Sequence, residues 1–174
     1  MRAPTPSVAL LAALAAALAA CGTPPSASEM PSLDRAAAAA ARRPLVGSCD
    51  LSFSPAPPSL PAPPAGVIRQ VDVGTCQLSH LGRTAYTGVL EIDFVAGTQT
   101  GTRTLTAANG DQLFMTAVGT SAPSGPGTRS ISATLTVTGG TGRFAGARGE
   151  VHATGTANLI TSTTASEFEG WITY

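Results

Sequence analysis

The sequence predicts an all-β domain over residues 45–174, folded as a single closed barrel of about eight antiparallel strands. Two observations lead to this fold class. Apolar and polar residues alternate strictly through several segments, which is typical of half-buried antiparallel strands. The polar faces are rich in threonine, whose branched side chain favours extended backbone, and no segment shows a convincing helical period.

Length and composition limit what the chain can be. Its 174 residues allow one domain of ordinary size, and ten basic residues, all arginine, balance ten acidic ones. A neutral chain without lysine argues against a nucleic-acid-binding protein or a polybasic protein of the membrane surface. We therefore expect no nucleic acid among its partners.

Residues 1–20 form a predicted signal peptide. The apolar run 8–20 follows Arg2 and is shorter than the roughly 20 residues that span a membrane. It ends in Leu-Ala-Ala-Cys, which resembles the bacterial lipobox, so Cys21 is the expected lipid attachment site. In bacterial lipoproteins, an aspartate directly after the cysteine favours retention in the inner membrane. This chain has Gly22 at that position, so the resemblance implies the outer membrane. The resemblance thus predicts a lipid-anchored, periplasm-facing protein; the alternative is soluble export after cleavage near Ala20.

Residues 21–44 are a predicted tether. Threonine, proline and serine dominate its first half, and such a stretch has little apolar surface to bury. The alanine run 36–41 could form a short helix, although isolated helices of that length are marginal in water.

Five segments of the domain alternate cleanly. Their apolar faces are Leu45, Cys49, Leu51 and Phe53; Tyr86, Leu90, Ile92 and Phe94; Ile131, Ala133, Leu135 and Val137; Val151, Ala153, Ala157 and Leu159; and Phe168, Ile172 and Tyr174. The opposite faces hold the acidic residues Asp50, Glu91, Asp93, Glu150, Glu167 and Glu169. The pattern therefore predicts an apolar interior without carboxylates.

Two regions are less regular. Along 68–78 the apolar residues change face, and an extra residue at Gly74-Thr75 would realign them, so we expect a β-bulge there. Asn109-Gly110 predicts a hairpin turn between strands near 103–107 and 112–118, whose register stays open. A two-sheet sandwich is the main alternative to the barrel, since both share this pattern.

Cys49 and Cys76 remain once Cys21 is acylated, and an exported protein meets an oxidising compartment. If the first two strands form a hairpin, pairing these cysteines centres the turn near residues 62–63, inside the proline-rich stretch 55–64. We expect a disulfide; the alternative is two buried free thiols.

A glycine-rich run at 137–149 reads Val-Thr-Gly-Gly-Thr-Gly-Arg-Phe-Ala-Gly-Ala-Arg-Gly. It resembles the signature of dirigent proteins and of the allene oxide cyclase-like barrels, and 74–78 and 107–111 are similar to bacterial relatives. The resemblance implies an eight-stranded antiparallel barrel. The residues of the structural turn are Gly139, Gly140, Gly142, Phe144 and Gly146. Glycine permits a sharp bend there, and Phe144 can then fold inward as a cap.

No catalytic residue, metal ligand set or cofactor motif is apparent. Two histidines, His80 and His152, and a paired set of cysteines make no metal cluster, and both histidines are expected on the surface. The favoured hypothesis is a lipoprotein whose barrel binds an apolar small molecule or a protein partner, of unknown oligomeric state. The alternative is the cyclase or coupling-guide activity that the resemblance implies. A carboxylate or histidine buried in a wet cavity would favour the latter, and a lumen filled with side chains would exclude it.

Overall fold

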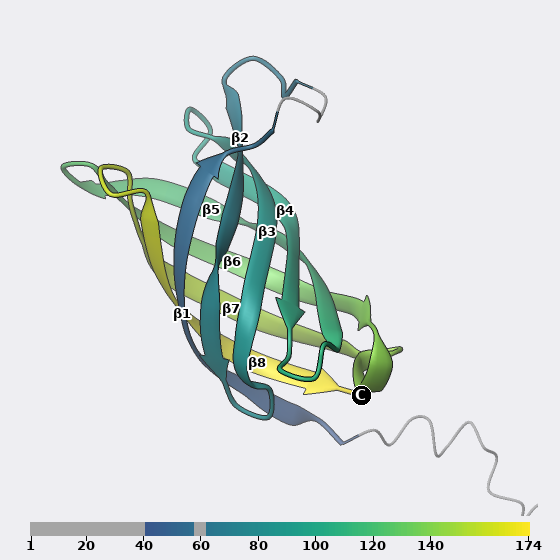
Figure 1. Ribbon diagram of the computed structural model, residues 1–174. Helices are drawn as coiled ribbons and strands as arrows, with labels where there is room; N and C mark the ends of the chain where they lie inside the picture. Colours follow the sequence, from purple (N-terminus) through teal and green to yellow (C-terminus); the bar gives the residue numbers. More distant parts are fainter. Residues whose placement is uncertain (1–40, 58–61) are drawn as a thin grey trace, which may run out of the picture.

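The computed structural model describes residues 41–57 and 62–174, which form one closed eight-stranded antiparallel barrel (Figure 1). The strands are β1 (Arg43–Pro55), β2 (Val67–Leu78), β3 (Gly82–Asp93), β4 (Thr98–Thr106), β5 (Gln112–Gly125), β6 (Thr128–Gly140), β7 (Arg148–Asn158) and β8 (Thr163–Thr173). A 3₁₀ turn, η1 (Gly142–Phe144), joins β6 to β7. In the described part of the chain, no helix has the length and apolarity needed to cross a membrane.

The signal peptide, Cys21 and the tether as far as residue 40 lie outside the described residues. The first strand begins at Arg43, two residues before the expected start of the domain. The sandwich is excluded, because every strand pairs with its neighbour in sequence and β1 pairs with β8 to close the ring. Closure leaves no strand edge free for pairing with another chain.

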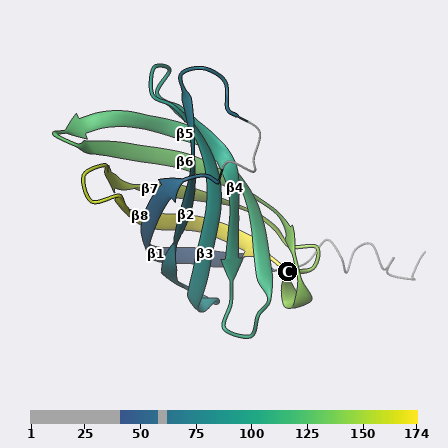
Figure 2. The ribbon, with the colours of Figure 1, turned by 45° about the horizontal axis from the view of Figure 1, so that its top comes forward.

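The barrel has two different ends, which Figure 2 shows from a second direction. The connections β1–β2, β3–β4, β5–β6 and β7–β8 lie at one end, here called the open end. The other end, the closed end, holds the remaining connections, the start of β1 and the end of β8. Alternate residues of each strand point into the lumen, so the five apolar faces predicted above form its wall.

The prediction of a β-bulge at Gly74-Thr75 is wrong. Strand β2 pairs in unbroken register with β3 over its whole length and with β1 from Gln70 to Leu78, so its face never switches. The apolar Val73 is therefore on the outer surface and half exposed, while Cys76 points inward. The ladder slips instead between β5 and β6, where Phe114 pairs with Gly139 but Met115 pairs with Val137.

The closed half of the lumen is packed with apolar side chains. Its buried members include Leu45, Leu81, Leu105, Leu113, Leu135, Val137, Phe144, Val151 and Ile172. The ring of Phe144 is fully buried and meets Tyr174 edge to face, with 4.9 Å between ring centroids. This packing supplies the main hydrophobic stabilisation and plugs one end of the barrel.

Glycines let the strands approach closely where the wall curves. A Cβ on Gly170 of β8 would lie 2.2 Å from the carbonyl oxygen of Glu150 and 2.5 Å from the Cα of Val151 on β7. Real Cβ atoms cannot occupy that space, so only glycine fits. Glycine at such positions is a known means of bending sheets into barrels.

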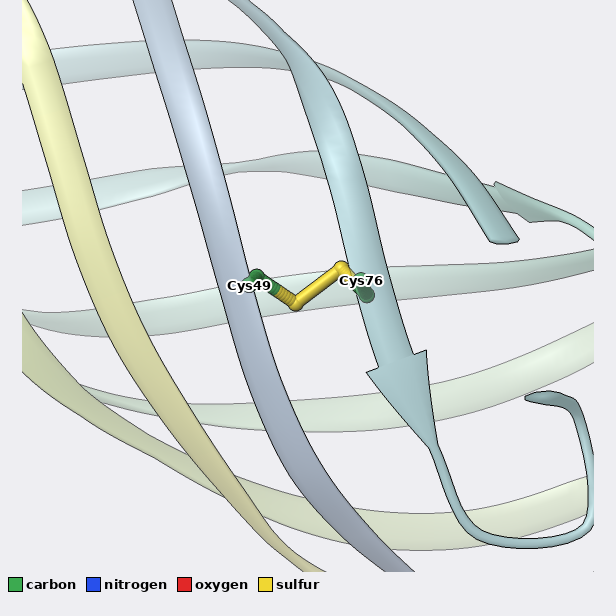
Figure 3. Close-up of a disulfide and its surroundings, with 2 residues drawn as sticks. All are labelled: Cys49 and Cys76. Atoms are coloured by element: carbon green, nitrogen blue, oxygen red, sulfur yellow. A yellow bond between two sulfur atoms is a disulfide. The ribbon is translucent and has the colours of Figure 1, made fainter. Parts of the chain in front are cut away.

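Cys49 and Cys76 form a disulfide across β1 and β2 (Figure 3). The two residues are direct partners in the antiparallel ladder, and both sulfurs lie in the buried interior. Their pairing links β1 covalently to β2, the two strands that the sequence analysis expected to form this hairpin.

Candidate functional site

Polar side chains line the lumen toward the open end, and two come from β2. Because β2 is unbroken, Gln70 and Asp72 share the inner face with Cys76. Asp72 is only 4% exposed, and its Oδ1 accepts a hydrogen bond of 2.7 Å from the Gln70 amide. The interior therefore contains a buried carboxyl group, contrary to the expected apolar interior, and Asp72 was not among the six acidic residues assigned to the outer faces.

Strands β3 and β4 add Tyr86 and Arg103, both buried on the inner face. Gly88 makes room for them: a Cβ there would lie 2.9 Å from Cδ of Arg103 and 3.2 Å from the Tyr86 hydroxyl. The Nη1 of Arg103 donates to the carbonyl oxygen of Thr102 at 3.1 Å. Together with Gln70 and Asp72, these residues form what we call the lumen cluster.

Burial governs the titration of the lumen cluster. It raises the pKa of Asp72 above its ordinary value of 3.8, while the hydrogen bond from Gln70 and the charge of Arg103 act in the opposite direction. Burial also raises the pKa of Tyr86; the nearby Arg103 opposes this change and Asp72 adds to it. The cluster thus holds protons on Asp72 and Tyr86 more firmly than water would.

A second polar group lies nearer the mouth of the lumen. Arg129 of β6 donates from Nε to the Ser121 hydroxyl at 2.8 Å and from a second nitrogen to the Ser121 carbonyl. Its guanidinium also stacks over the ring of Phe94, 4.6 Å from the centroid. A cation and an aromatic ring thus line the cavity near the open end, and the buried Gln99 lines it as well.

The open half of the lumen contains a cavity of about 50 Å³. Its wall combines the lumen cluster and the mouth residues with apolar side chains such as Leu51, Leu90 and Phe168. A larger hollow of about 720 Å³ lies at the open end, between β1, β2 and the described parts of their connection. Phe53 and Gln70 line both spaces, so the two adjoin.

The glycine-rich turn lies at the closed end, away from the lumen cluster. Gly142, in a left-handed conformation, packs against the Asp111 carboxylate, which accepts a hydrogen bond from the backbone N–H of Arg143 at 3.2 Å. This contact ties the β4–β5 turn to the β6–β7 connection and holds Phe144 in place. Gly139, Gly140 and Gly146 belong to the same connection.

The remaining residues singled out in the sequence do not join the cluster. His80 lies in the β2–β3 turn with φ of 62°, and His152 is exposed on the outer face of β7, 3.7 Å from Glu150. Among the residues that the structure describes, no group of three or more His, Cys, Asp or Glu could hold a metal ion.

Sequence reasoning missed Gln70, Asp72 and Arg103. The signal for the first two was available: they lie an even number of residues from Cys76, which was already assigned to the core. Arg103 shares its face with the buried Leu105, an arrangement that the apolar pattern of β4 does not reveal.

The chain was also compared with known proteins. No protein-family model matches the sequence, and no curated protein matches it. The barrel is similar to the solved structure of a pterocarpan synthase dirigent protein, at 16% sequence identity over 76% of this chain and 92% of that chain, with a TM-score of 0.45. This likeness concerns the fold alone and assigns no role to any residue of the lumen.

Proposed function

We propose that the open half of the barrel binds a small, mainly apolar molecule that carries one polar group. The observation behind the proposal is the lumen cluster, a few convergent polar side chains in a wall that is otherwise mostly apolar and is closed at the far end. Small-molecule sites commonly have this composition, because apolar surface supplies affinity and placed polar groups supply orientation.

The available space defines how such a molecule would bind. A cavity of about 50 Å³ is well below the roughly 300–1,000 Å³ of ordinary ligand pockets. The polar group would therefore enter the cavity beside Asp72 and Arg103, and the apolar body would extend past Phe53 into the larger hollow.

Fluorescence of a neutral, polarity-sensitive dye such as N-phenyl-1-naphthylamine tests this proposal. The full chain should enhance the emission, and Ala153→Phe, which adds a ring to the inner face of β7, should abolish the enhancement. Ala165→Phe on the exposed outer face of β8 is the matched control. Equal enhancement by all three proteins would place the dye outside the lumen and contradict the proposal.

A second function, catalysis by proton transfer, is favoured by the burial of Asp72. A carboxyl group with a raised pKa beside an apolar cavity is suited to donate a proton to a bound molecule. An isomerase or cyclase of the kind that the sequence resemblance implies would use Asp72 in this role, with Tyr86 and Arg103 orienting the substrate. Such an activity should be lost in Asp72→Asn while dye binding persists.

We also propose that the protein acts at the bacterial outer membrane, on its periplasmic side, with Cys21 as the lipidated residue. The lipobox-like end of the signal peptide supports this location. Several acyl chains on one cysteine would give stable anchoring, whereas a single chain is marginal.

A further inference from the structure

Arg103 is a buried cation in the lumen that no carboxylate of the described residues meets in an ion pair. Its side chain is 6% exposed, and its one hydrogen bond there joins Nη1 to the carbonyl of its neighbour Thr102. A guanidinium has further N–H donors, and buried charges in proteins are ordinarily paired. Within the described residues, no hydrogen bond or ion pair engages its other N–H groups, and the side chain lines the cavity.

Asp72 lies near this guanidinium but is engaged elsewhere. Its carboxyl group accepts a hydrogen bond from Gln70, and it interacts with Arg103 through space without direct contact. Both side chains line the same cavity of about 50 Å³. That cavity has room for a few atoms, which suits the polar end of a molecule more than its body.

We infer that Arg103 and Asp72 together bind the carboxylate of an organic acid, with Arg103 supplying the charge and Asp72 a proton. This rests on the proposed binding of a small molecule in the lumen and names its polar group. A carboxylate accepts hydrogen bonds from a guanidinium with good geometry, and its second oxygen can accept one from a carboxylic acid. Amines and other cations are disfavoured beside Arg103.

Arg103 favours the ionised form of Asp72, whereas burial and a bound carboxylate favour the protonated form. Besides Arg103 on β4, the charged or titratable groups on the inner wall are Tyr86 on β3 and Arg129 on β6. The described parts of β1, β5, β7 and β8 add no charged or titratable group to the cavity wall; Arg43 of β1 shares the parity of Leu45 but lies over Tyr174 at the closed end. A bound carboxylate would add a negative charge beside Asp72, and like charges disfavour ionisation. Binding should therefore take up a proton and weaken as the pH rises.

Isothermal titration of the full chain with phenylbutyrate and phenylbutanol tests the inference, because the two probes share a skeleton and differ in the head group. The acid should bind at least about tenfold more tightly than the alcohol, the scale of one hydrogen bond to a charged group. Titrations in two buffers of different ionisation enthalpy should show net proton uptake with the acid and none with the alcohol.

Arg103→Met should remove the preference for the acid, whereas Arg83→Met, on the exposed outer face of β3, should leave it unchanged. If Arg103→Met does not fold, Arg103→Gln provides a polar replacement for the same comparison. The proton-uptake measurement uses the unmodified chain and does not depend on any variant. Equal affinity of both probes for the unmodified chain, or a preference that survives Arg103→Met, would overturn the inference and leave the proposed function standing. If neither probe bound, the proposed function would fail with it.

Discussion

The side-chain amide of Gln70 donates a hydrogen bond of 2.7 Å to Asp72, its neighbour on the inner face of β2. The contact satisfies one oxygen of a carboxyl group that is almost completely shielded from solvent. It does not offset the penalty of burial, because the pKa of Asp72 is still raised. The fold therefore tolerates this acid at a cost in stability, as functional sites commonly do.

The first prediction concerns Asp72→Asn. A raised pKa means that the native state binds the proton more tightly than the unfolded state does. The stability linked to Asp72 is thus fully present below about pH 3.8 and is lost as the pH rises through the raised value. At neutral pH, Asp72→Asn should have a higher free energy of unfolding than the unmodified chain. Urea denaturation over a pH series checks this, with Asp50→Asn on the exposed face of β1 as the control.

The disulfide should contribute strongly to stability. Cys49 and Cys76 close a loop with a sequence separation of 27, for which the chain-entropy model gives roughly 3.5 kcal/mol. The Cys49→Ala/Cys76→Ala double variant should lose about that amount in urea denaturation. A loss below about 1 kcal/mol would mean that the unfolded chain is not appreciably restricted by the cross-link.

Replacing Phe144 by alanine should open a cavity at the closed end. Replacing a fully buried phenylalanine by alanine typically lowers the free energy of unfolding by about 3–5 kcal/mol. The edge-to-face contact of Phe144 with Tyr174 would also be lost. Phe94→Ala at the open end is the matched comparison. Because Phe94 is 37% exposed, its replacement should lower the free energy of unfolding by less. Thermal unfolding of both variants gives the ranking, and a reversed order would contradict the assignment of the closed end as the core.

Gly170→Ala tests whether close strand approach determines the shape of the wall. The added Cβ would meet backbone of β7 at 2.2 Å, which no side-chain rotation relieves, so we expect a loss of about 2 kcal/mol or more. Gly110→Ala meets nothing within 4 Å and should lose only the roughly 1 kcal/mol penalty of a left-handed residue. Comparable losses in denaturant unfolding would argue against the close-approach explanation.

Acylation of Cys21 has a direct readout. Intact mass spectrometry of the chain from a bacterial membrane fraction should show a diacylglycerol-modified N-terminal cysteine at position 21. The Cys21→Ser variant should leave the membrane fraction. An unmodified chain that begins near Gly22 or Cys21 would instead indicate soluble export.

Much of the fold could be predicted because alternation reports directly on which face is buried. The prediction of a β-bulge in β2 failed because it assumed that Val71 and Val73 face inward. Single valines on the outer surface of a barrel are ordinary. The site was harder, because Asp72 and Arg103 break the rule that inner positions are apolar. Cys76 gave the parity needed to place Asp72, whereas nothing local predicts that Arg103 lies near it across an intervening strand.

The start of β1 and the end of β8 both lie at the closed end of the barrel. Arg43, at the start of β1, pairs with Ile172 near the end of β8, and Arg42 and Arg43 stack on Trp171 and Tyr174. The open end, where Phe53 and Gln70 line both the cavity and the larger hollow, is on the opposite side. A fluorescent reporter or an immobilisation tag joined after Tyr174 would therefore lie at the closed end and would leave the open end accessible to ligands.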